Sequence, residues 1–153
     1  MASWQDFENA APEIAEAGKR LLYQFGVGLA FLATIRKDGA PRLHPICATV
    51  VNGRLYALIV PTLKRADLKR DGRYALHTFP PEKVDDEFLV MGRARFIEDV
   101  ATTEMVRADQ VARGMTTTAD EQAFEFSVER AMHAKYPGGH GTWPPKYSVW
   151  KER

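Results

Sequence analysis

Two tight-turn signals divide the first half of the chain into three β-type segments, and this feature limits the possible folds most. Asn52-Gly53 is the strongest short hairpin signal in the sequence, because both residue types accept the positive φ of a two-residue turn. It joins the apolar and β-branched run 42–51 to the run 54–60, and Lys37-Asp38-Gly39 joins run 42–51 to run 29–36. Three strands connected in this way predict an antiparallel meander, whose free edges must be paired or covered.

The rest of the chain predicts further strands and a few helices. Apolar residues at three- and four-residue spacing predict an N-terminal helix over about residues 5–25, with Pro12 either in its first turn or separating a short leading turn from it. Two more helices are expected at 62–71 and 100–113. Gly92, inside an apolar run, indicates a bulge or a close backbone approach. The remaining strands are expected at 73–79, 87–97, 124–128 and 146–151.

Six or seven antiparallel strands in a short chain hide their edges most economically by closing into a barrel. The 153 residues are enough for one domain with its own core and too few for two. We therefore expect a mainly β fold in a single domain over residues 1–153, a six- to seven-stranded antiparallel barrel with peripheral helices.

Charge and cysteine content exclude several classes of partner. The chain has 21 Lys and Arg against 20 Asp and Glu, so a net charge of +1 predicts no attraction to nucleic acid or to an anionic membrane. The single cysteine, Cys47, cannot form an internal disulfide, and its apolar neighbours indicate a small filler within a strand. No stretch reaches the ~18 apolar residues of a membrane span. We expect a cytoplasmic protein.

The chain lacks the short motifs of several enzyme classes. It has no CxxC, HExxH, GxSxG, Walker or GxGxxG motif, and no two of its four histidines have metal-ligand spacing. Neither a zinc enzyme nor a triad hydrolase is expected, no metal site is predicted and no catalytic residue can be assigned. His77, between Leu76 and Thr78, is expected to be a hydrogen-bonded structural residue.

A concentration of cationic and hydroxyl groups lies where a strand leads into a helix. Thr62, Lys64 and Arg65 are placed at this junction, where free backbone amides, a hydroxyl and two long cations together suit a phosphate group. Arg42, on a neighbouring strand, could reach the same place. The alternative is that the basic residues form only the solvated face of a short helix, and spacing alone leaves both interpretations open.

The order of several segments resembles the core of the pyridoxamine 5′-phosphate oxidase-like family. The similar segments cover somewhat under half of the chain: ATIRKDGAP (33–41), TLK (62–64) leading into LKRD (68–71), RYAL (73–76) and EFLVMGRA (87–94). The resemblance implies a split β-barrel and a homodimer in which two subunits share two flavin mononucleotide (FMN) sites at their interface.

The resemblance also implies which residues hold the cofactor. The family's Arg-led strand along the flavin matches Arg42, Leu43, His44, Pro45 and Ile46. Its Ser/Thr-x-Lys phosphate site matches Thr62 and Lys64, with Arg65 beside them. Glu87 stands where the oxidases carry a neutral amide. This is a departure, because a carboxylate repels phosphate, so Glu87 would serve structure or a different ligand orientation.

The resemblance implies a flavin-dependent oxidoreductase that acts on a small-molecule substrate. Oxidation of vitamin B6 is not expected, because the chain has no equivalent of the oxidases' basic C-terminal segment. Two alternatives remain: an oxidoreductase that uses the deazaflavin F420, or a non-catalytic flavin-binding or sensor protein. F420 would need additional cations, for which the candidates are Arg36, Lys37, Arg54 and Lys69. FMN is favoured because these cations also fit ordinary solvated positions.

Overall fold

A computed structural model describes residues 1–153 and shows a mainly β protein, as expected. Its four helices are α1 (Trp4–Ala10), α2 (Pro12–Leu22), α3 (Leu63–Arg70) and α4 (Val100–Ala112). Its eight strands are β1 (Leu29–Ile35), β2 (Pro41–Val51), β3 (Arg54–Ile59), β4 (Arg73–Thr78), β5 (Glu87–Phe96), β6 (Gln122–Phe126), β7 (Arg130–Lys135) and β8 (Lys146–Lys151). None of the helices is both long and apolar enough to span a membrane.

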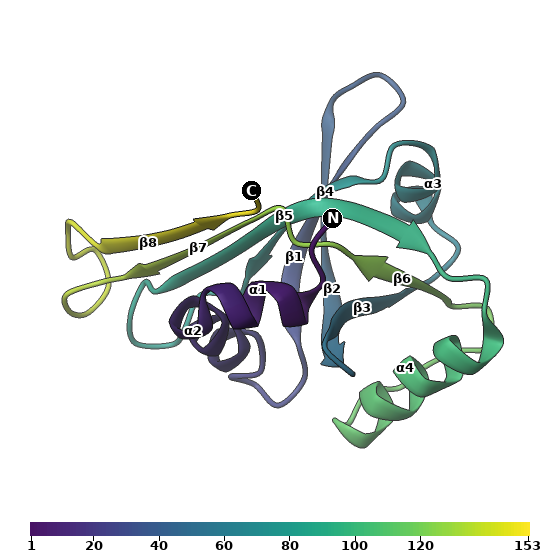
Figure 1. The fold of residues 1–153 in the computed structure, drawn as a ribbon, viewed down its shortest axis with the longest axis horizontal. Helices are drawn as coiled ribbons and strands as arrows, with labels where there is room; N and C mark the ends of the chain where they lie inside the picture. The colour runs from purple at the N-terminus through teal and green to yellow at the C-terminus, as the bar shows by residue number, and fades with distance from the viewer.

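Six of the strands close into an antiparallel barrel. The strand order is β4-β1-β2-β3-β6-β5, and pairing between β4 and β5 closes the ring. The remaining two strands, β7 and β8, extend the sheet from β5 and project beyond the barrel (Figure 1). The predicted barrel is confirmed: six strands form it, and with β7 and β8 the sheet has eight strands in all, one more than expected. The sequence gives little sign of β7, because its buried residues are alanines (Ala131 and Ala134) and its other residues are polar or flexible.

Gly92 lets β5 take part in two parts of the barrel wall. The first half of β5 pairs with β4 and β7, and residues 94–96 pair with β6. A Cβ atom at Gly92 would lie 2.1 Å from the carbonyl oxygen of Ser127, a distance that no real Cβ contact allows. The predicted close backbone approach is therefore confirmed, and glycine is required at this position.

The N-terminal segment forms two helices, α1 and α2, in agreement with the alternative in which Pro12 separates a short leading part from the longer helix. Pro12 is the first residue of α2, and Ala11 before it adopts φ −143° and ψ 64°, outside the helical region. This break follows from proline, whose ring disfavours a helical conformation in the preceding residue. A capping box between Ser3 and Asp6 fixes the start of α1.

Both N-terminal helices cover one face of the sheet. Trp4 and Phe7 of α1 are fully buried and form aromatic contacts with Phe88 of β5. The inner face presents one continuous row across six strands, in which only the last residue lies outside the core: Trp150, Ala131, Val90, Leu76, Leu32 and His44. The row therefore ends on β2 with His44, a polar residue on the inner face.

The opposite face of the same six strands has no covering helix. Directly paired residues have side chains on one face, and here they form two rows. One row is Val149, Met132, Leu89, His77, Phe31 and Pro45, and the next is Lys151, Arg130, Met91, Ala75, Ala33 and Leu43. Leu43 is 65% exposed and Val149 is 51% exposed. We call this surface, defined by the two rows, the open face.

Candidate functional site

Helix α3, which begins at the predicted phosphate site, is joined to the start of β2 by the ion pair between Asp67 and Arg42. Thr62 is the N-cap residue in an extended conformation, but its side chain makes no capping hydrogen bond. Its hydroxyl donates instead to the carbonyl of Val60 at 3.2 Å. The first-turn amides of α3 are therefore left without a side-chain acceptor, and such amides form a favourable environment for an anion.

Asp67, which the sequence analysis did not single out, organises this end of the barrel. The carboxylate is 3% exposed and accepts hydrogen bonds from Arg42 Nε at 2.6 Å, Thr34 Oγ1 at 2.9 Å and Arg70 Nη2 at 3.2 Å. Burial would raise the pKa of Asp67, but these hydrogen bonds outweigh it and hold the pKa below its usual value. One signal was available in the sequence, since Asp67 is the only acidic residue within the basic helix LKRADLKR.

Lys64 is a half-buried cation at this end of the barrel and has no carboxylate partner. No carboxylate lies within 4.0 Å of it, and burial lowers its pKa. Burial also lowers the pKa of His44, assisted by the positive charges of Lys64 and Arg42. The structure thus brings Arg42, His44 and Lys64 together. With one carboxylate shared by Arg42 and Arg70, this cluster keeps an excess of positive charge.

The other predicted site residues have different surroundings. The guanidinium of Arg65 donates to the backbone carbonyls of Asp120 at 2.8 Å and Ile59 at 3.3 Å, so it fastens the segment before β6 to the end of β3. Ile46 is 8% exposed and belongs to the core. Leu43 and Pro45 alternate with Arg42 and His44, and both lie on the open face.

Glu87 does not belong to the cluster of Arg42, His44 and Lys64 in its own chain. It lies at the start of β5, whereas α3 packs against the far end of that strand through Lys69 and Phe96. Its two carboxylate oxygens contact His77 Nε2 at 3.2 Å and the Tyr136 hydroxyl at 3.0 Å. The expected hydrogen-bonded role of His77 is confirmed.

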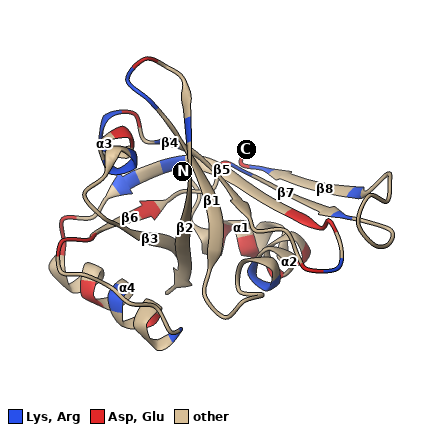
Figure 2. Ribbon diagram, turned by 180° about the vertical axis from the view of Figure 1, so that it is seen from behind, with Lys and Arg blue, Asp and Glu red and all other residues tan.

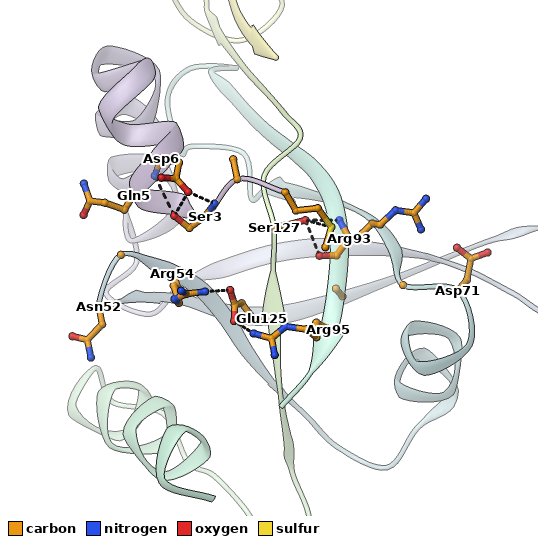
Figure 3. A pocket seen from close by; sticks show the side chains of 15 residues that line it. Ser3, Gln5, Asp6, Asn52, Arg54, Asp71, Arg93, Arg95, Glu125 and Ser127 are labelled. Carbon is orange, nitrogen blue, oxygen red and sulfur yellow. Dashed lines mark hydrogen bonds and ion pairs between the residues drawn. The ribbon is translucent and has the colours of Figure 1, made fainter. Parts of the chain in front are cut away.

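A large hollow lies elsewhere, on the outer side of β3, β5 and β6. It has a volume of about 780 Å³, and most of the residues that line it are polar or charged. Arg54 and Arg95 converge on Glu125 from two strands, and Arg93 points away from that pair (Figure 3). Asp6 is used as a helix cap, and Asp71 is paired with Arg73. Because these charges already have partners, the size of this hollow does not identify a binding site.

A smaller hollow adjoins the Lys64 cluster. It has a volume of about 430 Å³ and is lined by Arg36, Lys37, Asp38 and Arg42, with no apolar residue. Figure 2 shows basic residues on the β1–β2 hairpin and on the nearby helix α3. Arg36 pairs with Asp38 at 2.9 Å, and Lys37 has no carboxylate partner. Of the four candidate cations for a longer ligand, Arg36 and Lys37 therefore lie at this hollow.

The other two candidate cations are engaged elsewhere. Lys69 Nζ lies over the ring of Phe96, 4.2 Å from its centroid, and Arg54 belongs to the Glu125 cluster. Neither residue lines the smaller hollow beside the β1–β2 hairpin.

No protein-family model and no curated protein sequence matches the chain. Solved structures with a similar fold include a candidate 5-nitroimidazole antibiotic resistance protein from Bacteroides thetaiotaomicron (14% identity, 77% of this chain, 81% of that chain, TM-score 0.64). A candidate pyridoxamine 5′-phosphate oxidase from Listeria innocua is also similar (13% identity, 76% of this chain, 94% of that chain, TM-score 0.62). A third similar structure is that of a heme binding protein from Mycobacterium smegmatis (17% identity, 88% of this chain, 57% of that chain, TM-score 0.64). This chain spans little more than half of the length of that protein. The chain therefore has the split-barrel fold of the pyridoxamine 5′-phosphate oxidase-like proteins.

Proposed function

We propose that the chain binds FMN at the Lys64 cluster and works as a flavin-dependent oxidoreductase on a small-molecule substrate. One observation carries the proposal most: Lys64 is a half-buried ammonium without a carboxylate partner, beside His44 and Arg42. Removing a charge from water is unfavourable unless it is compensated, so an anionic ligand is the natural partner. A terminal phosphate supplies that charge.

The residues present fit a phosphorylated flavin. Lys64, Arg42 and the first-turn amides of α3 would hold the phosphate, because charge-assisted hydrogen bonds are the strong ones. Leu43 and Pro45 offer exposed apolar surface beside the cluster, which suits the body of a ring. The bound flavin would supply the electron chemistry, and the chain would position it and restrict access of water.

We also propose that a second copy of the chain covers the open face. The face spans six strands, and large apolar side chains such as Leu43 and Val149 remain exposed on it. Such a surface is unusual on a monomer, and a twofold dimer buries the same patch on both subunits. Glu87, which lies away from Lys64 in its own chain, would approach the cofactor only from the partner. We place the protein in the cytoplasm, since Cys47 has no disulfide partner.

Assembly can be tested with two matched variants and light scattering. Val149→Asp puts a charge on the open face, and Val111→Asp puts one on α4, at nearly equal exposure of 51% and 52%. We expect the wild type and Val111→Asp to be dimers and Val149→Asp to dissociate, because a buried charge without a partner is costly. A cofactor-loaded wild type that is monomeric would refute the dimer.

F420 is the second candidate, favoured by the hollow that Arg36 and Lys37 line beside Arg42. Its longer anionic tail could extend from the Lys64 cluster into this hollow. The purified protein's absorption spectrum and parallel titrations of the cofactor-free chain with FMN and F420 test both. We expect FMN to bind at least about tenfold more tightly, a difference of about 1.4 kcal/mol. Tighter binding of F420 would reverse the choice, and binding of neither would favour a non-flavin ligand-binding protein.

If FMN binds, turnover separates an oxidoreductase from a non-catalytic flavin-binding protein. Anaerobic bleaching of the flavin bands by a specific reductant, at a rate that depends on its concentration, is the result that supports an enzyme. A bound flavin that no physiological reductant bleaches would support the sensor alternative.

A further inference from the structure

His140, in the loop between β7 and β8, has two hydrogen-bond acceptors beside its imidazole ring. Its Nδ1 lies 2.7 Å from a carboxylate oxygen of Asp85, and its Nε2 lies 2.8 Å from the carbonyl oxygen of Glu82. Hydrogen bonds from Gly141 and His140 lower the pKa of Asp85, so this carboxylate is ionised where histidines titrate. Neither oxygen can then donate a proton to the ring.

This arrangement determines the protonation of the His140 ring. A neutral imidazole has one N–H donor and one acceptor nitrogen, so a ring between two acceptors leaves one contact as a repulsion of lone pairs. The doubly protonated ring donates to both neighbours. His140 is therefore matched to its surroundings only as an imidazolium.

Asp85, the acceptor of His140, also holds the backbone of the loop at 136–145. It accepts from the amide of Gly141 at 2.7 Å, on the oxygen that His140 does not use. The Tyr136 hydroxyl donates to Glu87, the first residue of β5, at 3.0 Å. The His140–Asp85 pair thus joins the β7–β8 loop to residues 79–86, which connect β4 to β5.

We propose that His140 and Asp85 form a proton-operated latch that holds the 136–145 loop against the β4–β5 connection and releases it when the imidazolium proton is lost. The loop carries Trp143, which is 71% exposed, and leads into Tyr147, which is 52% exposed. Tyr147 pairs with Ala134 of β7 and lies on the same side of β8 as Val149 of the open face. The latch determines how these aromatic side chains are presented there.

The charged groups around the latch set the direction of its pH response. Asp85 faces His140 from the β4–β5 connection, Asp86 beside it accepts from the Tyr136 amide at 2.9 Å, and Glu87 faces His77 from β5. The hydrogen bond to Asp85 raises the pKa of His140. The stabilisation by His140 is thus complete below the unfolded histidine pKa of about 6.5 and is lost as the pH rises through its higher folded value.

Neighbouring phenols do not change this direction. Burial and the hydrogen bond to Glu87 raise the pKa of Tyr136, so its hydroxyl stays protonated throughout the range in which histidines titrate.

Nuclear magnetic resonance of the full chain tests the latch through its backbone reporters. The amide of Gly141 should move along the titration curve of the His140 ring, whose midpoint should lie above that of a free histidine. In His140→Gln the pH-dependent shift of Gly141 should disappear, and in Asp85→Asn the midpoint of His140 should fall. His133→Gln is the control, since His133 Nε2 has no hydrogen-bond partner and this residue is not part of the latch.

A second readout uses the loop itself. With rising pH the loop of the wild type should become more mobile, which should change Trp143 fluorescence and speed protease cleavage within 136–145. In His140→Gln both signals should be independent of pH. The proposal is overturned if the Gly141 amide stays constant while His140 titrates. It is also overturned if loop cleavage in His140→Gln keeps the wild-type pH dependence.

Discussion

Two regions of the barrel are built from the same unit, a carboxylate between two arginines, yet they differ in what surrounds it. At one end Asp67, 3% exposed, binds Arg42 and Arg70. On the outer side of β3, β5 and β6, Glu125, 13% exposed, binds Arg54 and Arg95. Only the first has a further half-buried cation, Lys64, and the free first turn of a helix beside it. The end that we propose to bind a ligand is distinguished by this half-buried cation without a carboxylate partner, and not by the volume of its hollow.

The largest difference between the two clusters should appear in stability. Asp67→Ala should lower the free energy of unfolding by about 3 kcal/mol, because Arg42 and the buried Thr34 lose a shared acceptor. Glu125→Ala should lower it by about 1 kcal/mol or less, since its arginines are 48% and 64% exposed and regain water. Urea unfolding followed by circular dichroism measures both.

Asp67→Asn keeps the volume of the side chain and serves as the control for a cavity effect. If Glu125→Ala proves as costly as Asp67→Ala, the distinction between a buried anchor and a solvated cluster fails.

A smaller effect is expected from acid. The pKa of Asp67 is lowered in the folded chain, so its contribution to stability is present above the unfolded pKa of about 3.9 and is lost as the pH falls through the folded value. The wild type should therefore lose more stability than Asp67→Asn between neutral pH and the acid range. Parallel curves of unfolding free energy against pH for the two proteins would contradict this.

Local signals predicted most of the fold. The turn signals, the six barrel strands and the close approach at Gly92 are all present, because turn chemistry and strand periodicity act over a few residues. The break at Pro12 was stated as an alternative. β7 was missed because its alanines fit the sheet only through pairing with β5 and β8, which a local pattern does not contain.

In the candidate site, too, local sequence signals predicted some residues, while others depend on tertiary contacts. Lys64 and Arg42 were singled out from sequence, and the structure brings them together with His44. Asp67 was missed because its role depends on Thr34 and Arg42, both far away along the chain. Arg65 looked like part of the phosphate site, yet Asp120, 55 residues away, supplies one of its acceptors. Residue type identified the chemistry, and tertiary contacts decided which cations remain free.

The central claim, that Lys64 supplies free positive charge for a phosphate, is tested most directly by comparing two ligands on two variants of α3. Lys64→Ala removes the unpaired cation, and Lys69→Ala removes an exposed lysine of the same helix that lies on Phe96. Isothermal titration with FMN and riboflavin separates the phosphate from the ring. We expect Lys64→Ala to weaken the binding of FMN at least about tenfold, because one charge-assisted hydrogen bond of about 1.5 kcal/mol or more is lost. Its binding of riboflavin, and the binding of both ligands by Lys69→Ala, should change little. Equal losses for FMN and riboflavin in Lys64→Ala would contradict the account.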